Sequence, residues 1–213
     1  MIKCVIFDFD GTLVDSNQIK RKAFFSVTSH LSIYNRIMSD ILEDPKIGNR
    51  FEIFDCYVKR LNEKYKYIVD SSDLVNEYTL LCEKKIVKAT SIKGADKALM
   101  VLKKIDVKVV LSSATPFETL IKIIRKRKMS HLFDNIFGSP ESKEEHINKV
   151  MNIYSLNSNE ILYIGDSEID RKTALISVCF FLGVGEDDSR FHKKPQKLVN
   201  SLDSIVDVIS QFS

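Results

Sequence analysis

Short apolar runs recur along the chain between longer segments with helical periodicity. The runs are rich in Val, Ile and Phe, and few polar residues interrupt them. Continuous apolar runs of this length are typical of strands in a parallel sheet that helices cover on both faces. We therefore predict strands over residues 2–9, 107–112, 135–138, 161–164 and 178–182.

Helical patterns separate these strands. Apolar residues recur three and four positions apart from Ala95 to Ile105, after Pro116, and from Ile147 to Tyr154. Proline favours the first turn of a helix, so Pro116 marks a helix start. The alternation of strands and helices predicts an α/β core, a doubly wound, Rossmann-like parallel sheet.

The stretch between residues 14 and 90 has no strand pattern. It carries helical stripes at Ile19, Ala23 and Val27, at Phe51, Phe54, Val58, Leu61 and Tyr65, and at Leu74, Tyr78, Leu81 and Ile86. We predict a small helical domain over residues 14–90, inserted into a core made of residues 1–13 and 91–213. Residues 91–94 are then the return linker.

Composition and charge exclude several classes of protein. The chain has 213 residues, 44% of them hydrophobic and 29% charged, with a net charge of +3. So small an excess of positive charge does not indicate a nucleic-acid or membrane partner. The first apolar run stops at Asp8, too early for a signal peptide, and no stretch approaches the roughly 18 apolar residues of a membrane span. We expect a cytoplasmic monomer or small homo-oligomer with a small-molecule partner.

Two other groups of residues are predicted to have structural roles only. The cysteines Cys4, Cys56, Cys82 and Cys179 form no CxxC pair and lie in apolar stretches, so we predict free, buried thiols. The basic run at residues 122–128 lies near a predicted helix C-terminus, where cations suit the helix dipole, so we predict a solvated face.

Polar side chains gather where the predicted strands end. In an open parallel sheet, ligands bind outside the carboxyl ends of the strands. Those ends, with the residues just beyond them, carry Asp8 and Asp10, Ser112 and Ser113, Lys143, and Asp166 and Asp170. Asp8 and Asp10 are two residues apart, so both side chains can lie on one side of an extended segment. Asp166 and Asp170 are four apart, as neighbours on a helix face are.

Carboxylates gathered at one edge predict a bound cation. They cannot all stay ionised without a compensating charge, and their hard oxygen ligands favour Mg²⁺, which shares its site with substrate phosphate. An aspartate can also act as a nucleophile toward phosphorus, with Mg²⁺ and Lys143 offsetting the repulsion between like charges. A second carboxylate can protonate the leaving alkoxide and later deprotonate water.

Four segments together resemble a known family, the haloacid dehalogenase superfamily. Residues 6–13 (IFDFDGTL) are similar to its first motif, DxDGT, and residues 109–113 (VVLSS) to its second. Lys143 matches the lysine of the third motif, and residues 164–170 (IGDSEID) match the GDxxxD of the fourth. The helical insertion resembles the cap of the phosphoglycolate phosphatase-like and β-phosphoglucomutase-like branch.

The resemblance implies a role for each matched residue. Asp8 is the nucleophile and a Mg²⁺ ligand, while Asp10 is the general acid/base and ligates Mg²⁺ through its backbone carbonyl. Ser113, rather than Ser112, hydrogen-bonds the transferring phosphoryl group. Lys143 neutralises nucleophile and phosphate. Asp166 ligates Mg²⁺, with support from Asp170, for which a purely structural role is the alternative. The third motif departs from the common pattern, because Gly-Ser-Pro-Glu-Ser-Lys replaces Gly-Lys-Pro-x-Pro.

Further residues are expected to bind substrate. Gly11, which permits a turn and close backbone approach, lies with Thr12 and Ala114 beside the motif residues. In the helical insertion the candidates are Arg21, Lys46, Gly48 and Arg50, of which residues 46–50 could form a specificity loop.

These expectations predict a Mg²⁺-dependent phosphatase that acts on a small phosphorylated metabolite through an aspartyl-phosphate. The alternatives are a sugar phosphomutase on the same scaffold and a non-enzymatic, Mg²⁺-dependent phospho-acceptor module. A dehalogenase has no use for Asp10, because halide leaves without a proton.

Overall fold

The computed structural model describes residues 1–28, 32–44, 47–65 and 69–212, without the side chains of residues 32–34. The chain divides into two compact units, one made of residues 1–16 and 87–213 and the other of residues 17–86. The boundaries therefore fall after Ser16 and before Val87, close to the positions expected from the sequence.

The first unit is built on a parallel sheet with the strand order β3-β2-β1-β4-β5-β6. The strands are β1 (Cys4–Phe7), β2 (Lys108–Pro116), β3 (Asn135–Ser139), β4 (Ile161–Gly165), β5 (Phe180–Val184) and β6 (Leu198–Val199). The five predicted strands are present in this parallel arrangement, which confirms the doubly wound α/β fold. The pattern missed β6 because it has only two residues.

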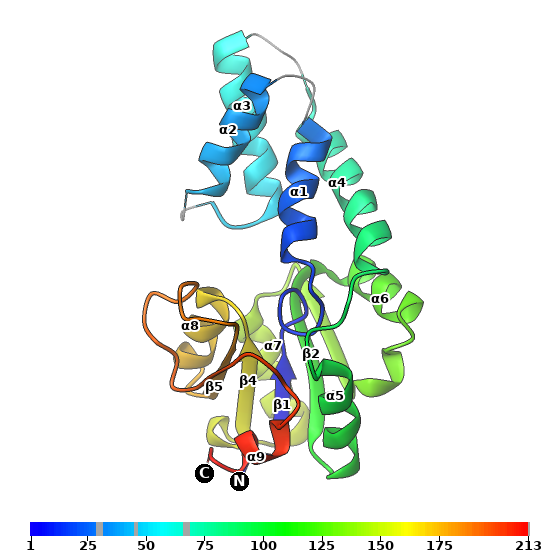
Figure 1. Cartoon of the computed structure of the whole chain (residues 1–213), viewed down its shortest axis with the longest axis vertical. Coiled ribbons are helices and arrows are strands. Elements are labelled where there is room, and N and C mark those ends of the chain that lie inside the picture. Colours follow the sequence, from blue (N-terminus) through cyan, green and yellow to red (C-terminus); the bar gives the residue numbers. More distant parts are fainter. Residues whose placement is uncertain (29–31, 45–46, 66–68, 213) are drawn as a thin grey trace. The chain divides into compact units, whose positions relative to one another are not determined.

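Helices cover both faces of this sheet (Figure 1). They are α5 (Ala95–Lys104), α6 (Phe117–Lys126), α7 (Lys143–Tyr154), α8 (Glu168–Ile176) and α9 (Ile205–Ile209), with 3₁₀ turns at Ser130–Leu132 and Ser158–Glu160. Helix α5 packs against α9, and α7 packs against α8. The α7 and α8 layer buries one set of alternate strand residues, which includes Cys4, Ile6, Val110, Tyr163 and Phe181. Alternation along each strand then turns the other set toward the opposite layer.

The return from the helical unit is fastened to the α/β unit. Val14 and Ser91 form an antiparallel bridge, and the amide of Asp15 donates to Thr90 O at 3.0 Å. The Arg127 guanidinium donates to Ala89 O at 2.6 Å and to Val87 O at 3.3 Å. Arg127 is half-buried, so the prediction that residues 122–128 form a wholly solvated face is wrong at this position. The planar guanidinium of Arg127 has several N–H donors, so it can bind more than one backbone carbonyl of this segment at once.

The second unit packs four described helices around an aromatic centre. These are α1 (Asn17–Thr28), α2 (Ser32–Leu42), α3 (Arg50–Tyr65) and α4 (Ser71–Ile86). Helix α1 contacts α2 and α4, and α3 contacts the same two helices. The rings of Phe24, Phe54 and Tyr78 lie 4.3–5.7 Å apart between centroids, and all three side chains are buried.

The stripe predicted on α3 is partly wrong. Phe51 is 52% exposed and Tyr65 37%, whereas the buried face carries Ile53, Phe54, Tyr57 and Leu61. Each residue advances a helix by about 100°, so the predicted and the observed apolar stripes of α3 run over the same segment on neighbouring faces. Which of the two faces is buried depends on the helices that pack against α3. Helix α2 was not predicted at all.

The cysteines agree with the prediction in part. All four are free thiols; Cys4 and Cys82 are buried, but Cys56 and Cys179 are only half-buried. Burial raises the pKa of Cys4 to about 12, so this thiol is inert at neutral pH. Among the described residues, no helix combines the length and apolar composition needed to cross a bilayer.

Candidate active site

The site begins where β1 ends, at the middle of the sheet. Phe7 pairs with Leu111 of β2 and with Ile164 of β4, and the amide of Asp8 donates to Ile164 O at 2.9 Å. Asp8 therefore leaves β1 level with the end of β4, which Gly165 and Asp166 follow. Strand register alone brings the first and fourth sequence motifs together.

Three carboxylates converge at this edge. Asp8, Asp166 and Asp170 are all buried, and each has a ligand oxygen within 4.8 Å of the others. The expected meeting of Asp8 with the fourth-motif aspartates is thus what the structure shows. Oxygens at this separation could hold a small divalent cation between them.

Asp166 and Asp170 meet differently from the helix-face expectation. Helix α8 starts at Glu168, after the N-cap Ser167, so Asp166 precedes the helix. Asp170 is in the first turn, where its Oδ2 accepts from the Ser167 amide at 3.1 Å and from the Ser167 hydroxyl at 2.5 Å. Gly165 leaves room for this turn, because a Cβ at this position would overlap with the Asp170 side chain. Asp170 therefore caps the helix with one oxygen and offers the other to the site.

Lys143 lies between two of the carboxylates. Its Nζ donates to Asp8 Oδ1 at 2.6 Å and to Asp170 Oδ1 at 2.5 Å, and the side chain is 11% exposed. The lysine is the first residue of α7, whose N-cap Ser142 forms a capping box with Glu145. A cation at a helix N-terminus opposes the helix dipole, so the carboxylates must supply the compensating attraction.

The charges in this cluster perturb each other. Burial lowers the pKa of Lys143, but Asp170 and Asp8 outweigh it and raise that pKa well above its ordinary value. Burial also raises the pKa of Asp8, and Asp170 and Asp166 raise it further. The Lys143 ammonium opposes this rise without cancelling it. The acidic cluster thus holds more negative charge than Lys143 neutralises, an imbalance that a bound cation would relieve.

Asp10 does not join the three carboxylates by its side chain. Residues 9–14 turn back, with the amides of Leu13 and Val14 donating to Phe9 O, and Gly11 has a φ of 82°. Asp10 Oδ1 accepts from the Ser16 hydroxyl at 2.6 Å, and Oδ2 from the Thr115 hydroxyl at 3.1 Å. Asp10 still lies near enough for its charge to raise the pKa of Asp8, so the expectation that both side chains lie on one side of the segment stays a prediction.

The two serines of the second motif have different surroundings. Ser112 Oγ lies 2.8 Å from His146 Nδ1, and the Tyr163 hydroxyl donates to it at 3.3 Å, inside the layer under α7. Ser113 is 1% exposed, and its Oγ accepts from the Thr115 amide at 3.1 Å. The hydrogen bonds of Ser112 belong to the core, which leaves Ser113 as the serine available for another role.

The remaining substrate-binding candidates are scattered. Thr12 is buried, and its hydroxyl has no partner in the described part of the chain, whereas Ala114 is exposed. In the helical unit, Arg21 is exposed and the Gly48 amide donates to Glu52 at 2.9 Å. Arg50 donates to Thr79 Oγ1 at 3.1 Å and lies over the Tyr78 ring, so its guanidinium is used within that unit. Lys46 lies outside the described residues.

Three residues near the site escaped the sequence analysis. Thr115 and Ser16 bind Asp10; Thr115 lies two residues after the second motif, and a hydroxyl in that position was a usable signal. The third is Arg190, whose Nη1 donates to Asp166 Oδ2 at 2.6 Å. Nothing around Arg190 in the sequence marks it, because a loop of unpredictable course carries it there.

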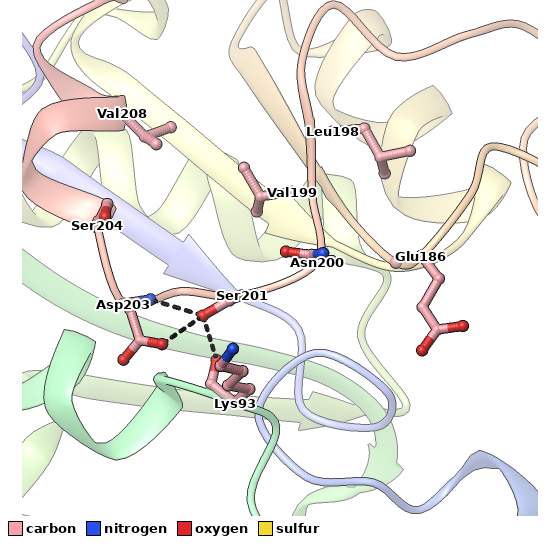
Figure 2. A pocket seen from close by; sticks show the side chains of 10 residues that line it. Lys93, Glu186, Leu198, Val199, Asn200, Ser201, Asp203, Ser204 and Val208 are labelled. Carbon is pink, nitrogen blue, oxygen red and sulfur yellow. Dashed lines mark hydrogen bonds between the residues drawn. The ribbon is translucent and has the colours of Figure 1, made fainter.

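A separate hollow of about 560 Å³ lies near β6 (Figure 2). Its lining includes Lys93, Glu186, Asn200, Ser201 and Asp203, and none of the motif residues. Ser201 Oγ donates to Asp203 at 2.7 Å and to Lys93 O at 3.4 Å. Its polar groups thus tie the C-terminal segment to the start of α5 rather than converge on a ligand.

Comparison with known proteins shows which family the chain belongs to. A sequence model of the family described as haloacid dehalogenase-like hydrolase matches residues 5–184. The chain belongs to this family. No curated protein matches the sequence significantly.

Several solved structures share the fold of this chain. A β-phosphoglucomutase from Clostridium difficile is 21% identical, with a TM-score of 0.78 over 100% of this chain and 97% of that one. The HAD-hydrolase YfnB from Bacillus subtilis, bound to magnesium, is 18% identical, with a TM-score of 0.76 over 98% of each chain. CbbY from Rhodobacter sphaeroides, in complex with phosphate, is 14% identical, with a TM-score of 0.72 over 96% of each chain.

Proposed function

We propose that this haloacid dehalogenase-like hydrolase is a Mg²⁺-dependent phosphatase that cleaves a small phosphorylated metabolite through an aspartyl-phosphate. The observation that carries the proposal is the Lys143 ammonium bound to both Asp8 and Asp170, with Asp166 beside them at the ends of β1 and β4. Magnesium in one structural relative and phosphate in another support it.

The carboxylate cluster suits Mg²⁺ by its chemistry. Its donors are hard carboxylate oxygens from three buried aspartates, and these oxygens lie within 4.8 Å of one another. Asp8 and Asp166 would hold the ion, with Asp170 supporting them from the helix cap. When bound, Mg²⁺ would supply positive charge that neutralises the phosphate and keeps Asp8 ionised.

Each step is assigned to a residue of the chain. An Asp8 oxygen attacks phosphorus, and the bond from phosphorus to the ester oxygen breaks as Asp10 gives its proton to the leaving alkoxide. Lys143 and the Ser113 hydroxyl bind the phosphoryl oxygens, whose charge must be offset as the anionic nucleophile approaches. In the second step Asp10 takes a proton from water, the water oxygen attacks phosphorus, and the bond to Asp8 breaks to release phosphate.

Phosphate release from a panel of phosphomonoesters tests this function directly. We expect turnover with Mg²⁺ and none after chelation by EDTA. Asp8→Asn should lower the rate by more than about a thousandfold, because the amide cannot form the aspartyl-phosphate. Asp207→Asn, which changes an exposed carboxylate in α9, is the control and should keep the wild-type rate. Wild-type turnover in Asp8→Asn would refute the proposal.

A sugar phosphomutase is the second candidate, favoured by the fold shared with a β-phosphoglucomutase. Both reactions begin with phosphoryl transfer to Asp8, and they differ in whether water or a sugar hydroxyl accepts the group. A mutase would isomerise a sugar phosphate without net release of phosphate. Chromatography of the sugar phosphates, run beside the phosphate assay, separates the two reactions.

A further inference from the structure

Arg190 lies outside the four sequence motifs, yet it contacts the candidate metal site. Its Nη1 donates to Asp166 Oδ2 at 2.6 Å. The Asp166 side chain is 6% exposed and that of Arg190 is 53% exposed. The ion pair therefore joins a surface side chain to a buried carboxylate of the site.

The loop that carries Arg190 is anchored directly after it. The Phe191 side chain is 8% exposed and packs edge-on against Phe181, with ring centroids 5.9 Å apart. The amide of His192 donates to Glu168 Oε2 at 3.1 Å. Arg171 in turn holds Glu168 through two hydrogen bonds, of 2.8 and 2.7 Å. This loop follows β5 and lies beside α8 (Figure 1), so its packing brings Arg190 to Asp166.

Arg190 changes the charge that the site presents. When ionised, the carboxylates of Asp8, Asp166 and Asp170, together with Lys143 and Arg190, carry one net negative charge. A divalent cation would turn this into one net positive charge, which attracts a phosphate dianion. Without Arg190, the same cation would leave the group neutral. The arginine should therefore oppose the cation and favour the phosphate.

We propose that Arg190 is a specificity-determining counter-charge, which weakens the binding of the divalent cation and strengthens the binding of phosphate at the loaded site. This inference rests on the proposed function, because it needs a metal site at Asp166. It assigns Arg190 to the recognition of dianionic substrates, although the residue belongs to none of the motifs.

Titration calorimetry on the full chain tests the proposal with two probes, Mg²⁺ alone and inorganic phosphate at saturating Mg²⁺. We expect Arg190→Gln to bind Mg²⁺ about three to ten times more tightly at low ionic strength, and phosphate more weakly by a similar factor. Both differences should shrink in about 0.5 M KCl, because salt screens a half-exposed charge. Lys193→Gln, the same charge change at an exposed position of the same loop, should leave both affinities unchanged.

Arg190→Lys covers the case in which Arg190→Gln fails to fold. Arg190→Lys keeps the positive charge, so its affinities for Mg²⁺ and for phosphate should stay near the wild-type values. Lys193→Gln shows the effect of the same change in net charge away from Asp166. If Arg190→Gln weakens Mg²⁺ binding, or matches Lys193→Gln, the counter-charge is refuted while the metal site stands. If the wild-type protein does not bind Mg²⁺ at all, the metal-dependent function fails and this inference fails with it.

Discussion

The α/β unit and the helical unit use their polar residues in opposite ways. In the α/β unit, Asp8 and Asp166 leave neighbouring strands at the same level, and their charges meet in a buried cluster. In the helical unit, Arg50 donates to Thr79 on α4, and the Gly48 amide, just before α3, donates to Glu52 in that helix. Strand register therefore concentrates charge at one edge of the sheet. In the helical unit, these polar groups instead form hydrogen bonds within and between the helices.

This contrast separates two kinds of stability. The α/β unit contains a buried charge cluster that is costly unless every carboxylate is compensated. The helical unit depends on apolar burial, with Phe24, Phe54 and Tyr78 at its centre. Substitutions at matched buried and exposed positions in each unit should therefore differ in their cost to stability.

The largest effect is expected at Lys143. Lys143→Met leaves Asp8 and Asp170 buried without their ammonium, which should lower the free energy of unfolding by about 3–5 kcal/mol. Denaturant unfolding measures the loss. Added Mg²⁺ should raise the free energy of unfolding more in the variant than in the wild type. Lys149→Met, in the same helix, removes an exposed ion pair with Glu141 and a contact with the Phe137 ring, and should cost at most about 1 kcal/mol. Equal losses in the two variants would contradict the buried cluster.

A comparable loss is expected at Phe54 in the helical unit. Phe54→Ala should cost about 3–5 kcal/mol, because it empties the centre of the aromatic cluster. Limited proteolysis should then cut within residues 17–86 while Mg²⁺ binding by the α/β unit persists. Phe51→Ala, in the same helix but 52% exposed, should change stability by about 0.5 kcal/mol or less. A larger cost at Phe51 would restore the stripe predicted from the sequence.

The smallest effect is expected at Asp134, in the α/β unit. Its carboxylate accepts from Lys103 at 2.8 Å and from the Val109 amide at 2.8 Å, and these bonds outweigh burial and lower its pKa. A lowered folded-state pKa stabilises the protein above the unfolded value of about 3.9, and this gain is lost as the pH falls through the folded value. Asp134→Asn should therefore cost about 1 kcal/mol at pH 7.

That difference should shrink as the pH falls below the unfolded pKa of about 3.9 and through the lowered folded-state pKa of Asp134. Thermal unfolding of both proteins across pH 2–7 measures it. Asp106→Asn, at an exposed position with a φ of 56° that asparagine tolerates, is the control and should show no such dependence. A cost at Asp134 that did not change with pH would indicate a packing defect instead of a lost charge.

Much of the α/β unit could be predicted because its strands are buried on both faces. The strands β1, β4 and β5 are uninterrupted apolar runs, and the polar residue that follows such a run marks its end, as Asp8 does after β1. The meeting of Asp8 with Asp166 follows from this, since parallel strands share one edge. Three features could not be predicted from the sequence, because each depends on what packs against it. They are the buried face of α3, the helix α2 and the short strand β6.

From the amino-acid sequence alone came the parallel core, the helical insertion and the acidic and hydroxyl residues at one edge of the sheet, since local periodicity and strand ends record them directly. Tertiary structure alone decided that Asp10 binds Ser16 and Thr115, that Ser112 belongs to the core, and that Arg190 reaches Asp166. Turns and loops bring together residues that are distant in sequence, and no local pattern encodes where a loop will pack. A charge balance that depends on such contacts can be read only from the folded chain.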